Sequence, residues 1–201
     1  MIVHTFQQGL LSTNCYVLQH QNTCVVVDVA FVSQELENFI LQNKLQLQAV
    51  LLTHGHFDHC GGVEHLLQTV GKADVFVHVE DVELCKTAQQ NPWGVPCQNC
   101  IPTKTYGQGR LCVGSFEFEV LHTPGHTHGS VVLLCQDKMF AGDTLFRGSI
   151  GRTDFAESNK TAMKTSLQKI KQIQGDYTVF CGHGPATLLS KEKETNVFLC
   201  H

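Results

Sequence analysis

Short apolar runs alternate with amphipathic stretches along the first part of the chain. The runs typical of buried strands are 15–18, 24–28, 49–52 and 74–78. Polar residues 20–22, between the first two runs, predict a hairpin turn. Apolar residues at helical spacing follow Ser33 and the Gly61-Gly62 pair, and a further helix is expected over 79–88. The pattern therefore predicts strands and helices in alternation.

Strands dominate the second part of the chain. Pro, Gly and Asn interrupt the pattern over 91–109, a segment that contains Trp93 and predicts a loop between two halves, approximately 1–90 and 110–201. The strands expected after it are 110–113, 116–121, 130–135, 138–141 and 177–181, and the helices 162–173 and 190–199. We therefore expect one domain over 1–201, with two sheets packed face to face and helices on their outer faces.

Composition and charge narrow the class of protein. A chain of 201 residues with 42% hydrophobic content can bury a sizeable core. No apolar run approaches the roughly 18 residues of a membrane span, and the first residues do not resemble a secretory leader. A net charge of -4 provides no global positive field. We therefore expect a cytoplasmic protein that binds neither nucleic acid nor membranes; the sequence gives no prediction of its oligomeric state.

The ten cysteines are expected to be reduced thiols, because disulfide frameworks belong to short secreted chains. Cys24, Cys135 and Cys181 lie within apolar runs and are expected to be buried. Cys97 and Cys100 form a lone C-x-x-C in the interrupted segment. Without a second C-x-x-C, a structural zinc site is disfavoured. A redox-active pair is a weaker interpretation than two ordinary reduced thiols.

The stretch Thr53-His54-Gly55-His56-Phe57-Asp58-His59 contains the densest group of candidate ligands. It follows the expected strand 49–52 directly, so its side chains are placed at the carboxyl end of that strand. Three imidazoles and a carboxylate within six residues predict a metal site. This combination suits zinc, iron or manganese, whereas a calcium site would use oxygen ligands only.

Three further candidate ligands follow later strands. His126, Asp143 and His183 each lie on a glycine-bearing turn after an apolar run. Glycine permits the positive φ or the close backbone approach by which a short turn directs a ligand inward. Together with the earlier stretch, these residues give five histidines and two aspartates, a number that divides naturally over two metal ions.

These motifs resemble the metallo-β-lactamase superfamily. The segments 123–127, 142–146, 151–155 and 181–185 are similar to the short hydroxyacylglutathione hydrolase group, which is glyoxalase II-like. The resemblance implies a four-layer αββα sandwich, mixed in α and β, with two mixed β-sheets. It implies that one metal is held by His54, His56 and His126, that the other is held by Asp58, His59 and His183, and that Asp143 bridges the two.

The remaining histidines, and Cys60, are not expected to bind metal. His122 and His128 flank His126 and are expected to support it, and Cys60 is expected to lie beside the site next to His59. The histidines outside the motifs are expected to face solvent or to be satisfied in the core. These are His4, His20, His65, His78 and His201.

The function implied by the resemblance is hydrolysis of a hydroxyacyl thioester such as S-lactoylglutathione by a metal-bound hydroxide. Two divalent ions, zinc or alternatively iron or manganese, less two carboxylates and a hydroxide leave a charge of about +1, which suits a small anionic thioester. Asp58 is the expected catalytic residue, because it would orient the nucleophile. Arg152 is the expected substrate contact, with a local salt bridge as an equal alternative.

Several other functions compete with this interpretation. A mononuclear iron persulfide dioxygenase would use only His54, His126 and Asp143, and such enzymes share the 151–155 motif. A generalist thioesterase acting on another thiol is the second alternative, because the chain ends 18 residues beyond His183, without the helical extension of longer glyoxalase II-like enzymes. A metal-binding protein without catalysis is disfavoured, since no ligand is missing. His59 argues against the true β-lactamases, for which the resemblance implies a different ligand set.

Overall fold

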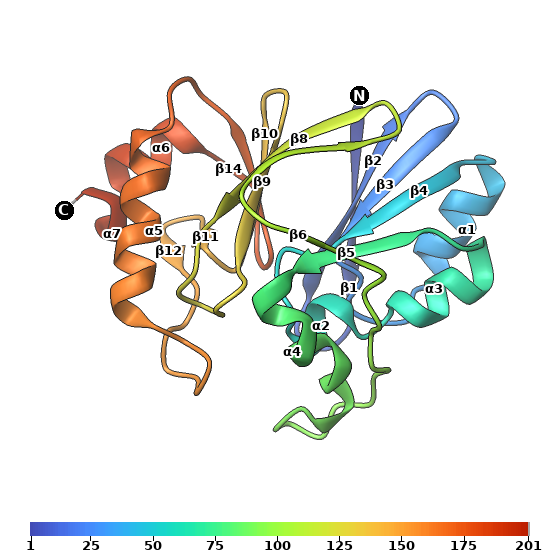
Figure 1. Cartoon of the computed structure of the whole chain (residues 1–201). Coiled ribbons are helices and arrows are strands. Elements are labelled where there is room, and N and C mark those ends of the chain that lie inside the picture. Colours follow the sequence, from blue (N-terminus) through green and yellow to red (C-terminus); the bar gives the residue numbers. More distant parts are fainter. Residues whose placement is uncertain (201) are drawn as a thin grey trace.

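Two six-stranded mixed sheets form the centre of the molecule in the computed structural model, which describes residues 1–200 (Figure 1). The first sheet has its strands in sequence order, antiparallel from β1 to β3 and parallel from β3 to β6. These strands are β1 (Ile2–Gln8), β2 (Thr13–His20), β3 (Thr23–Val27), β4 (Gln46–Leu51), β5 (Asp74–His78) and β6 (Lys104–Tyr106).

The second sheet has the order β14-β13-β10-β9-β8-β7. Only β10 and β13 pair in parallel in it; its other pairings are antiparallel. Its strands are β7 (Gly109–Val113), β8 (Phe116–His122), β9 (Val131–Cys135), β10 (Lys138–Gly142), β13 (Thr178–Cys181) and β14 (Thr187–Leu188). A separate hairpin consists of β11 (Leu145–Phe146) and β12 (Ser149–Ile150).

Helices cover both outer faces and complete four layers (Figure 1). On the first sheet lie α1 (Gln34–Gln42) and α3 (Val63–Val70), and on the second lie α5 (Lys160–Gln172), α6 (Leu189–Thr195) and α7 (Val197–Cys200). The shorter elements are α2 (Phe57–Cys60), η1 (Val79–Asp81), α4 (Val82–Lys86) and η2 (Ala88–Gln90). The expected αββα sandwich is confirmed.

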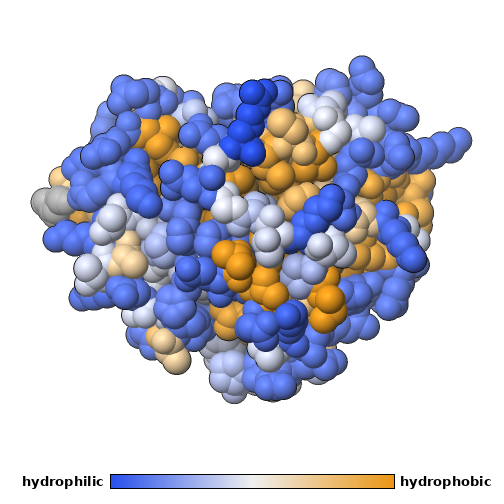
Figure 2. Space-filling model, viewed as in Figure 1, coloured by the Kyte–Doolittle hydropathy of each residue, from blue (hydrophilic) through white to orange (hydrophobic). Residues whose placement is uncertain are grey.

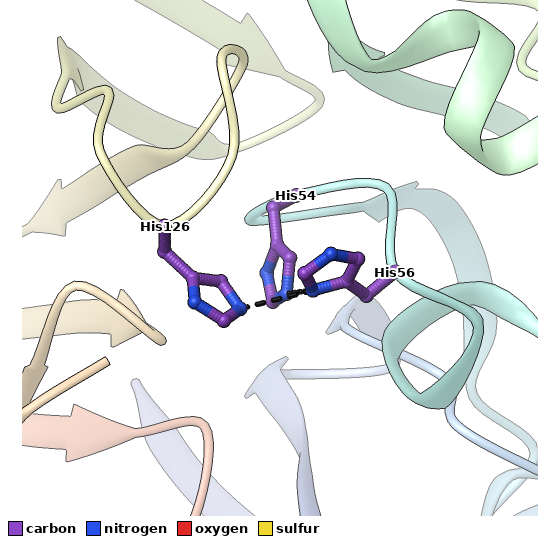
Figure 3. A group of neighbouring side chains, drawn as sticks. All are labelled: His54, His56 and His126. Carbon is purple, nitrogen blue, oxygen red and sulfur yellow. Dashed lines mark hydrogen bonds between the residues drawn. The ribbon is translucent and has the colours of Figure 1, made fainter. Parts of the chain in front are cut away.

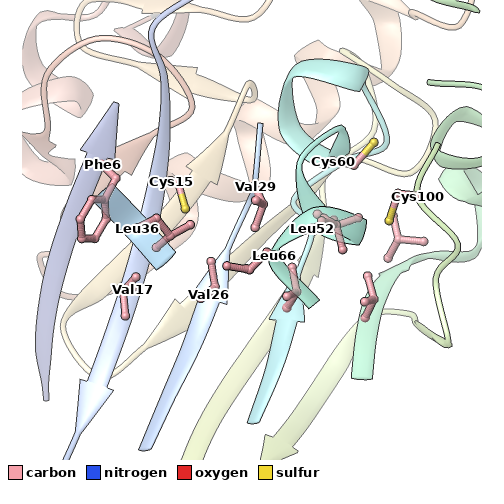
Figure 4. Close-up of a cluster of buried hydrophobic side chains, with 14 of the residues drawn as sticks. Phe6, Cys15, Val17, Val26, Val29, Leu36, Leu52, Cys60, Leu66 and Cys100 are labelled. Atoms are coloured by element: carbon pink, nitrogen blue, oxygen red, sulfur yellow. The ribbon is translucent and has the colours of Figure 1, made fainter. Parts of the chain in front are cut away.

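The core explains this layering, because successive strand residues point to opposite faces of a sheet. Val26 and Val50 pack with the helices on the outer face of the first sheet, whereas Val25 and Leu51 pack against the second sheet. Figure 4 shows the outer cluster, in which Cys15, Cys60 and Cys100 fill space among Phe6, Val17, Leu36 and Leu66. A third cluster lies between the second sheet and its helices.

All ten cysteines are free thiols, and Cys24, Cys135 and Cys181 are buried as expected. In the C-x-x-C, the Cys97 Sγ lies 3.3 Å from the carbonyl oxygen of Ala88. The Cys100 side chain is fully buried in the outer cluster of the first sheet. The two cysteines therefore pack the 91–103 segment, to which they belong, against the outer cluster of the first sheet.

Several elements differ from the sequence-based expectation. The pattern did not predict β1, because it is an edge strand with mostly polar residues, nor the three-residue β6 within the expected loop. It also did not predict the two-residue strands β11, β12 and β14. The helix expected over 79–88 is divided into η1, α4 and η2. The helix expected over 190–199 is interrupted after Thr195 and resumes as α7, because the Asn196 side chain donates to the carbonyl oxygen of Ser149 and accepts from the N–H of Phe198.

The visible face in Figure 2 is mainly hydrophilic, with separate apolar patches. Within residues 1–200, no helix has the length and apolar character required to cross a bilayer.

Candidate metal centre

The candidate ligands come from four loops that follow strands of both sheets. The loop and short helix after β4 contribute four of them, and the loops after β8, β10 and β13 contribute one each. The structure brings together all seven residues that the sequence singled out, which are His54, His56, Asp58, His59, His126, Asp143 and His183.

The first group consists of His54, His56 and His126 (Figure 3). His56 Nδ1 lies 3.1 Å from His54 Nε2 and 2.9 Å from His126 Nε2. The rings come from two loops and direct one nitrogen each toward a common point (Figure 3). His54 and His126 are buried, so these nitrogens converge in a space largely removed from water.

The second group consists of Asp58, His59 and His183. Asp58 Oδ2 lies 3.4 Å from His183 Nε2 and 3.9 Å from His59 Nε2. Asp143 lies between the two groups, because its Oδ2 is 3.4 Å from His126 Nε2 in the first group and 3.5 Å from His183 Nε2 in the second. Its Oδ1 is 3.4 Å from His59 Nε2.

Each of the five imidazoles uses its outer nitrogen to contact an oxygen atom. His54 Nδ1 is 3.1 Å from Thr53 Oγ1, a hydroxyl that itself donates to the Asp28 carboxylate. The other contacts are His56 Nε2 with Glu157 Oε1 at 2.7 Å, His59 Nδ1 with Asp28 Oδ2 at 2.9 Å, His126 Nδ1 with the Arg152 carbonyl oxygen at 2.9 Å and His183 Nδ1 with the Leu11 carbonyl oxygen at 3.1 Å. When the outer nitrogens carry these protons, neutral rings direct lone pairs inward, as metal binding requires.

Two buried polar atoms at the centre have no hydrogen-bond partner within residues 1–200. They are His59 Nε2 and Asp143 Oδ1. A buried polar atom without a partner is costly and requires an explanation. A cation placed between the converging nitrogens and carboxylate oxygens would satisfy both atoms, so the donor set fits divalent metal ions.

Two positions at the centre require glycine because other atoms approach their backbone closely. A Cβ at Gly151 would lie 1.7 Å from the carbonyl oxygen of Asp143, and a Cβ at Gly182 would lie 2.1 Å from Asp143 Oδ1. Neither position has room for a side chain. Both glycines allow the 151–158 loop and the β13 loop to close around Asp143.

Residues of the 151–158 loop contact the histidines of the first group and hold them in place. The sequence did not indicate this role for most residues of the loop. Besides the contact of His126 with the Arg152 carbonyl, Ser158 Oγ donates to the His126 carbonyl oxygen at 2.7 Å. The Phe155 ring lies edge-on to His56, with centroids 5.4 Å apart. Glu157 was missed because a single glutamate in a loop carries no sequence signal, and its partner His56 lies 101 positions away.

Glu157→Gln is expected to weaken metal binding by the first group by about 10- to 100-fold, because carboxylate partners of ligating histidines raise ligand basicity and fix ring orientation. The hydrogen bond from His56 holds the pKa of Glu157 below its usual range, so the wild-type residue is a carboxylate. Metal competition titrations measure the change. Glu83→Gln, at a surface glutamate, is the control and is expected to bind metal like the wild type; equal affinities of all three proteins would contradict the role of Glu157.

The support of His126 expected from His122 is wrong. His122 stacks on His78 with centroids 4.0 Å apart, and its Nε2 contacts the carbonyl oxygen of His128 rather than His126. The His128 residue is exposed, and its support of His126 stays a prediction. The Cys60 thiol lies 3.6 Å from the carbonyl oxygen of Gly55, between the ligands His54 and His56, so it lies beside the site as expected. His201 lies outside the described residues.

The pKa values of the histidines shift in opposite directions in the two groups. Burial lowers the pKa of His54 well below its usual range and also lowers that of His126. Burial alone would lower the pKa of His59, but Asp28 and Asp143 outweigh it and raise that pKa well above its usual range. For His183, the hydrogen bond to Asp58 and the charge of Asp143 likewise outweigh burial and raise the pKa.

Protons are therefore expected to compete with metal mainly at the second group, because an imidazole must be neutral to bind. Lowering the pH from 8 to 6 should therefore weaken the binding of the metal ion held by the second group more than that of the ion held by the first. In a titration, the second group should fill last, so the second binding step should lose more affinity than the first. Calorimetric titrations of metal into metal-free protein at both pH values measure this. An equal loss of affinity at both steps would contradict the assignment.

A cavity of about 350 Å³ opens over the two groups. Its apolar lining includes Leu11, Trp93, Phe146, Ile150 and Phe155. Arg152 also lines it and pairs with Asp154 through two contacts of 2.9 Å. The pair with Asp154 is the local salt bridge expected as one alternative for Arg152, and a substrate contact by this residue stays a prediction.

The order of these ligands along the chain matches a known family. The family model of the metallo-beta-lactamase superfamily matches residues 8–183, which include every candidate ligand. The chain belongs to the metallo-beta-lactamase superfamily. Its coarse functional class is accordingly that of metal-binding hydrolases.

Curated relatives in this superfamily span nearly the whole chain. "Probable metallo-hydrolase YqgX" of Bacillus subtilis is 32% identical over 95% of this chain and 94% of its own length. "Hydroxyacylglutathione hydrolase GloC" of Haemophilus influenzae is 32% identical over 98% of this chain and 95% of its own length. Both support the expected resemblance to metallo-hydrolases.

Solved structures with this fold are similar to the chain over nearly its whole length. TTHA1623 in a di-iron-bound form is 33% identical, with a TM-score of 0.90, covering 98% of this chain and all of its own. ETHE1 from Myxococcus xanthus is 27% identical, with a TM-score of 0.77, covering 98% of this chain and 84% of its own. BLEG-1, described as a B3 metallo-beta-lactamase, is 31% identical, with a TM-score of 0.93, and both chains are fully covered. Overall similarity therefore does not separate this chain from a protein described as a β-lactamase, and the distinction expected from His59 stays a prediction.

Proposed function

We propose that the protein is a binuclear metal-dependent thioester hydrolase that acts on a hydroxyacyl thioester such as S-lactoylglutathione. The observation that carries this proposal is the position of Asp143, which contacts both ligand groups and has a buried Oδ1 without a hydrogen-bond partner within residues 1–200. The GloC relative supports the substrate class. In this proposal the seven candidate residues hold two divalent ions, with zinc as the expected metal and iron or manganese as alternatives.

Two bound ions would lower the pKa of a water molecule and polarise the thioester carbonyl. The protein's own residues orient the reactants. Asp58 is largely buried and its pKa is lowered, because His59 and His183 outweigh the effect of burial, so it is an acceptor able to orient a water molecule. Arg152 at the rim supplies a positive charge toward an anionic substrate.

The cavity has two distinct ends. Leu11 and Phe146 lie near His183, since the Leu11 carbonyl contacts His183 Nδ1 and the Phe146 ring lies 6.1 Å from that imidazole. Phe155 and Trp93 lie near His56 at the opposite end. We place the leaving thiol at the His183 end and the acyl group at the His56 end.

The test combines metal content with turnover. Purified protein should contain about two metal ions per chain, as in other two-metal hydrolases, and should release free thiol from S-lactoylglutathione, measured with a thiol-reactive chromophore. Absence of thiol release from fully metal-loaded protein would refute the proposal. A generalist thioesterase would instead cleave lactoyl thioesters of several thiols at similar rates.

A mononuclear iron persulfide dioxygenase is the second candidate, and the ETHE1 relative favours it. In this alternative only His54, His126 and Asp143 hold metal. Oxygen consumption on glutathione persulfide with one iron per chain would establish it. The convergence of Asp58, His59 and His183 on Asp143 favours the binuclear proposal, since a mononuclear enzyme has no use for a second ligand group.

A further inference from the structure

A second cavity, of about 410 Å³, adjoins the cavity over the metal centre. His56, Trp93 and Phe155 line both cavities. The Trp93 ring lies 6.0 Å from that of Phe155 and 5.4 Å from that of Phe57, which lines only the second cavity. This side cavity therefore begins where the metal-centre cavity ends, at a pair of aromatic rings beside a candidate ligand.

The lining of the side cavity selects for neutral, apolar groups. Leu84, Ala88, Pro92 and Ala156 extend the apolar surface beyond the aromatic rings, and the neutral polar lining residues are Thr87, Gln90 and Asn91. Glu157 is the only acidic residue in the lining, which contains no lysine or arginine. The Glu157 carboxylate, whose Oε1 lies 2.7 Å from His56 Nε2, repels an anionic group that enters.

We infer that the side cavity binds the acyl chain of the substrate, and that the preferred thioesters have a neutral, apolar acyl group of medium length. The inference rests on the proposed function, in which the acyl group lies at the His56 end. Its volume is within the range of small-molecule sites, which are mostly apolar and contain few polar groups. A lactoyl group would leave most of this space unfilled.

A series of glutathione thioesters tests the inference by acyl chain. Each buried methylene group contributes a factor of about four in binding, so kcat/KM for the hexanoyl thioester should exceed that for the acetyl thioester at least about tenfold. The glutaryl thioester is similar in length but ends in a carboxylate, and it should fall below hexanoyl because of Glu157. Equal kcat/KM values for all three would overturn the inference.

Ala156→Leu provides the matching variant, because Ala156 is an exposed loop residue whose enlargement fills the side cavity without disturbing the core. The ratio of hexanoyl to acetyl kcat/KM should fall at least about fivefold, the factor of one to two buried methylene groups. Thr161→Leu places the same side chain at an exposed position of α5, outside the lining of the side cavity, and should keep the wild-type ratio. An unchanged ratio in Ala156→Leu would place the acyl chain elsewhere.

A binding measurement separates this inference from the proposed function. Trp93 is the only tryptophan of the chain and lines the side cavity, so its fluorescence reports on occupancy. Hexanoate added to the metal-loaded protein should shift the emission to shorter wavelength, whereas acetate and glutarate should not. If no thioester is hydrolysed but hexanoate shifts the emission, the proposed function fails and the apolar site stands; no shift with hexanoate would overturn the site itself.

Discussion

Asp143→Ala is expected to lower metal occupancy at both ligand groups and to reduce thioester hydrolysis on the order of 10³-fold, which corresponds to about 4 kcal/mol of transition-state stabilisation. Among residues 1–200, no other carboxylate is placed like this one, with Oδ2 3.4 Å from His126 and 3.5 Å from His183. Its charge is assured, because the neighbouring histidines, chiefly His59, outweigh burial and hold the pKa of Asp143 far below its usual range. Metal analysis by mass spectrometry and thiol release measure the two effects.

His65→Ala is the control for this variant. The His65 side chain is 37% exposed and contacts Glu37 of α1 at 3.3 Å from its position on α3, and it belongs to neither ligand group. Its removal is expected to change neither metal content nor turnover. Asp143→Asn preserves side-chain volume, so a loss in this variant as well would exclude a packing defect as the cause. Equal losses from Asp143 and His65 variants would show that the ligands are misassigned.

The candidate ligands could be predicted because their chemistry is dense in the sequence. His54, His56, Asp58 and His59 lie within six positions, directly after a buried strand. His126, Asp143 and His183 each follow a strand whose apolar run is evident. Since strands of both sheets end at the same place, their following loops meet there, and the sequence order of the motifs was sufficient to anticipate this.

The partners of these ligands could not be predicted, because each is a common residue that acquires its role from the fold. Asp28 follows β3 and reaches His59 across 31 positions, while its own backbone has a positive φ of 56°. Glu157 reaches His56 across 101 positions. The strands that escaped prediction were edge or very short strands, in which little apolar pattern is needed; they are β1, β6, β11, β12 and β14.

His183→Ala distinguishes the binuclear hydrolase from the mononuclear alternative. In the proposed hydrolase, the second ligand group then consists of Asp58 and His59 alone, so metal content should fall from about two ions to about one. Thiol release should fall by about 10²- to 10³-fold, since one of the two charges acting on the thioester is lost. The His183 side chain is 27% exposed at the end of the cavity, so its removal leaves no buried void and the fold should persist.

The mononuclear alternative leads to the opposite result, because His54, His126 and Asp143 are all retained in this variant. The wild type and the variant would then each contain one iron per chain, and both would consume oxygen on glutathione persulfide at the same rate. A metal content that does not fall between the two proteins, or undiminished oxygen consumption, would refute the binuclear hydrolase. His122→Ala is the matched control, since His122 stacks on His78 without reaching the ligand groups. It should retain the metal content and turnover of the wild type. A selective loss of one metal together with thiol release would therefore assign a function to the second ligand group, which a single-metal enzyme does not require.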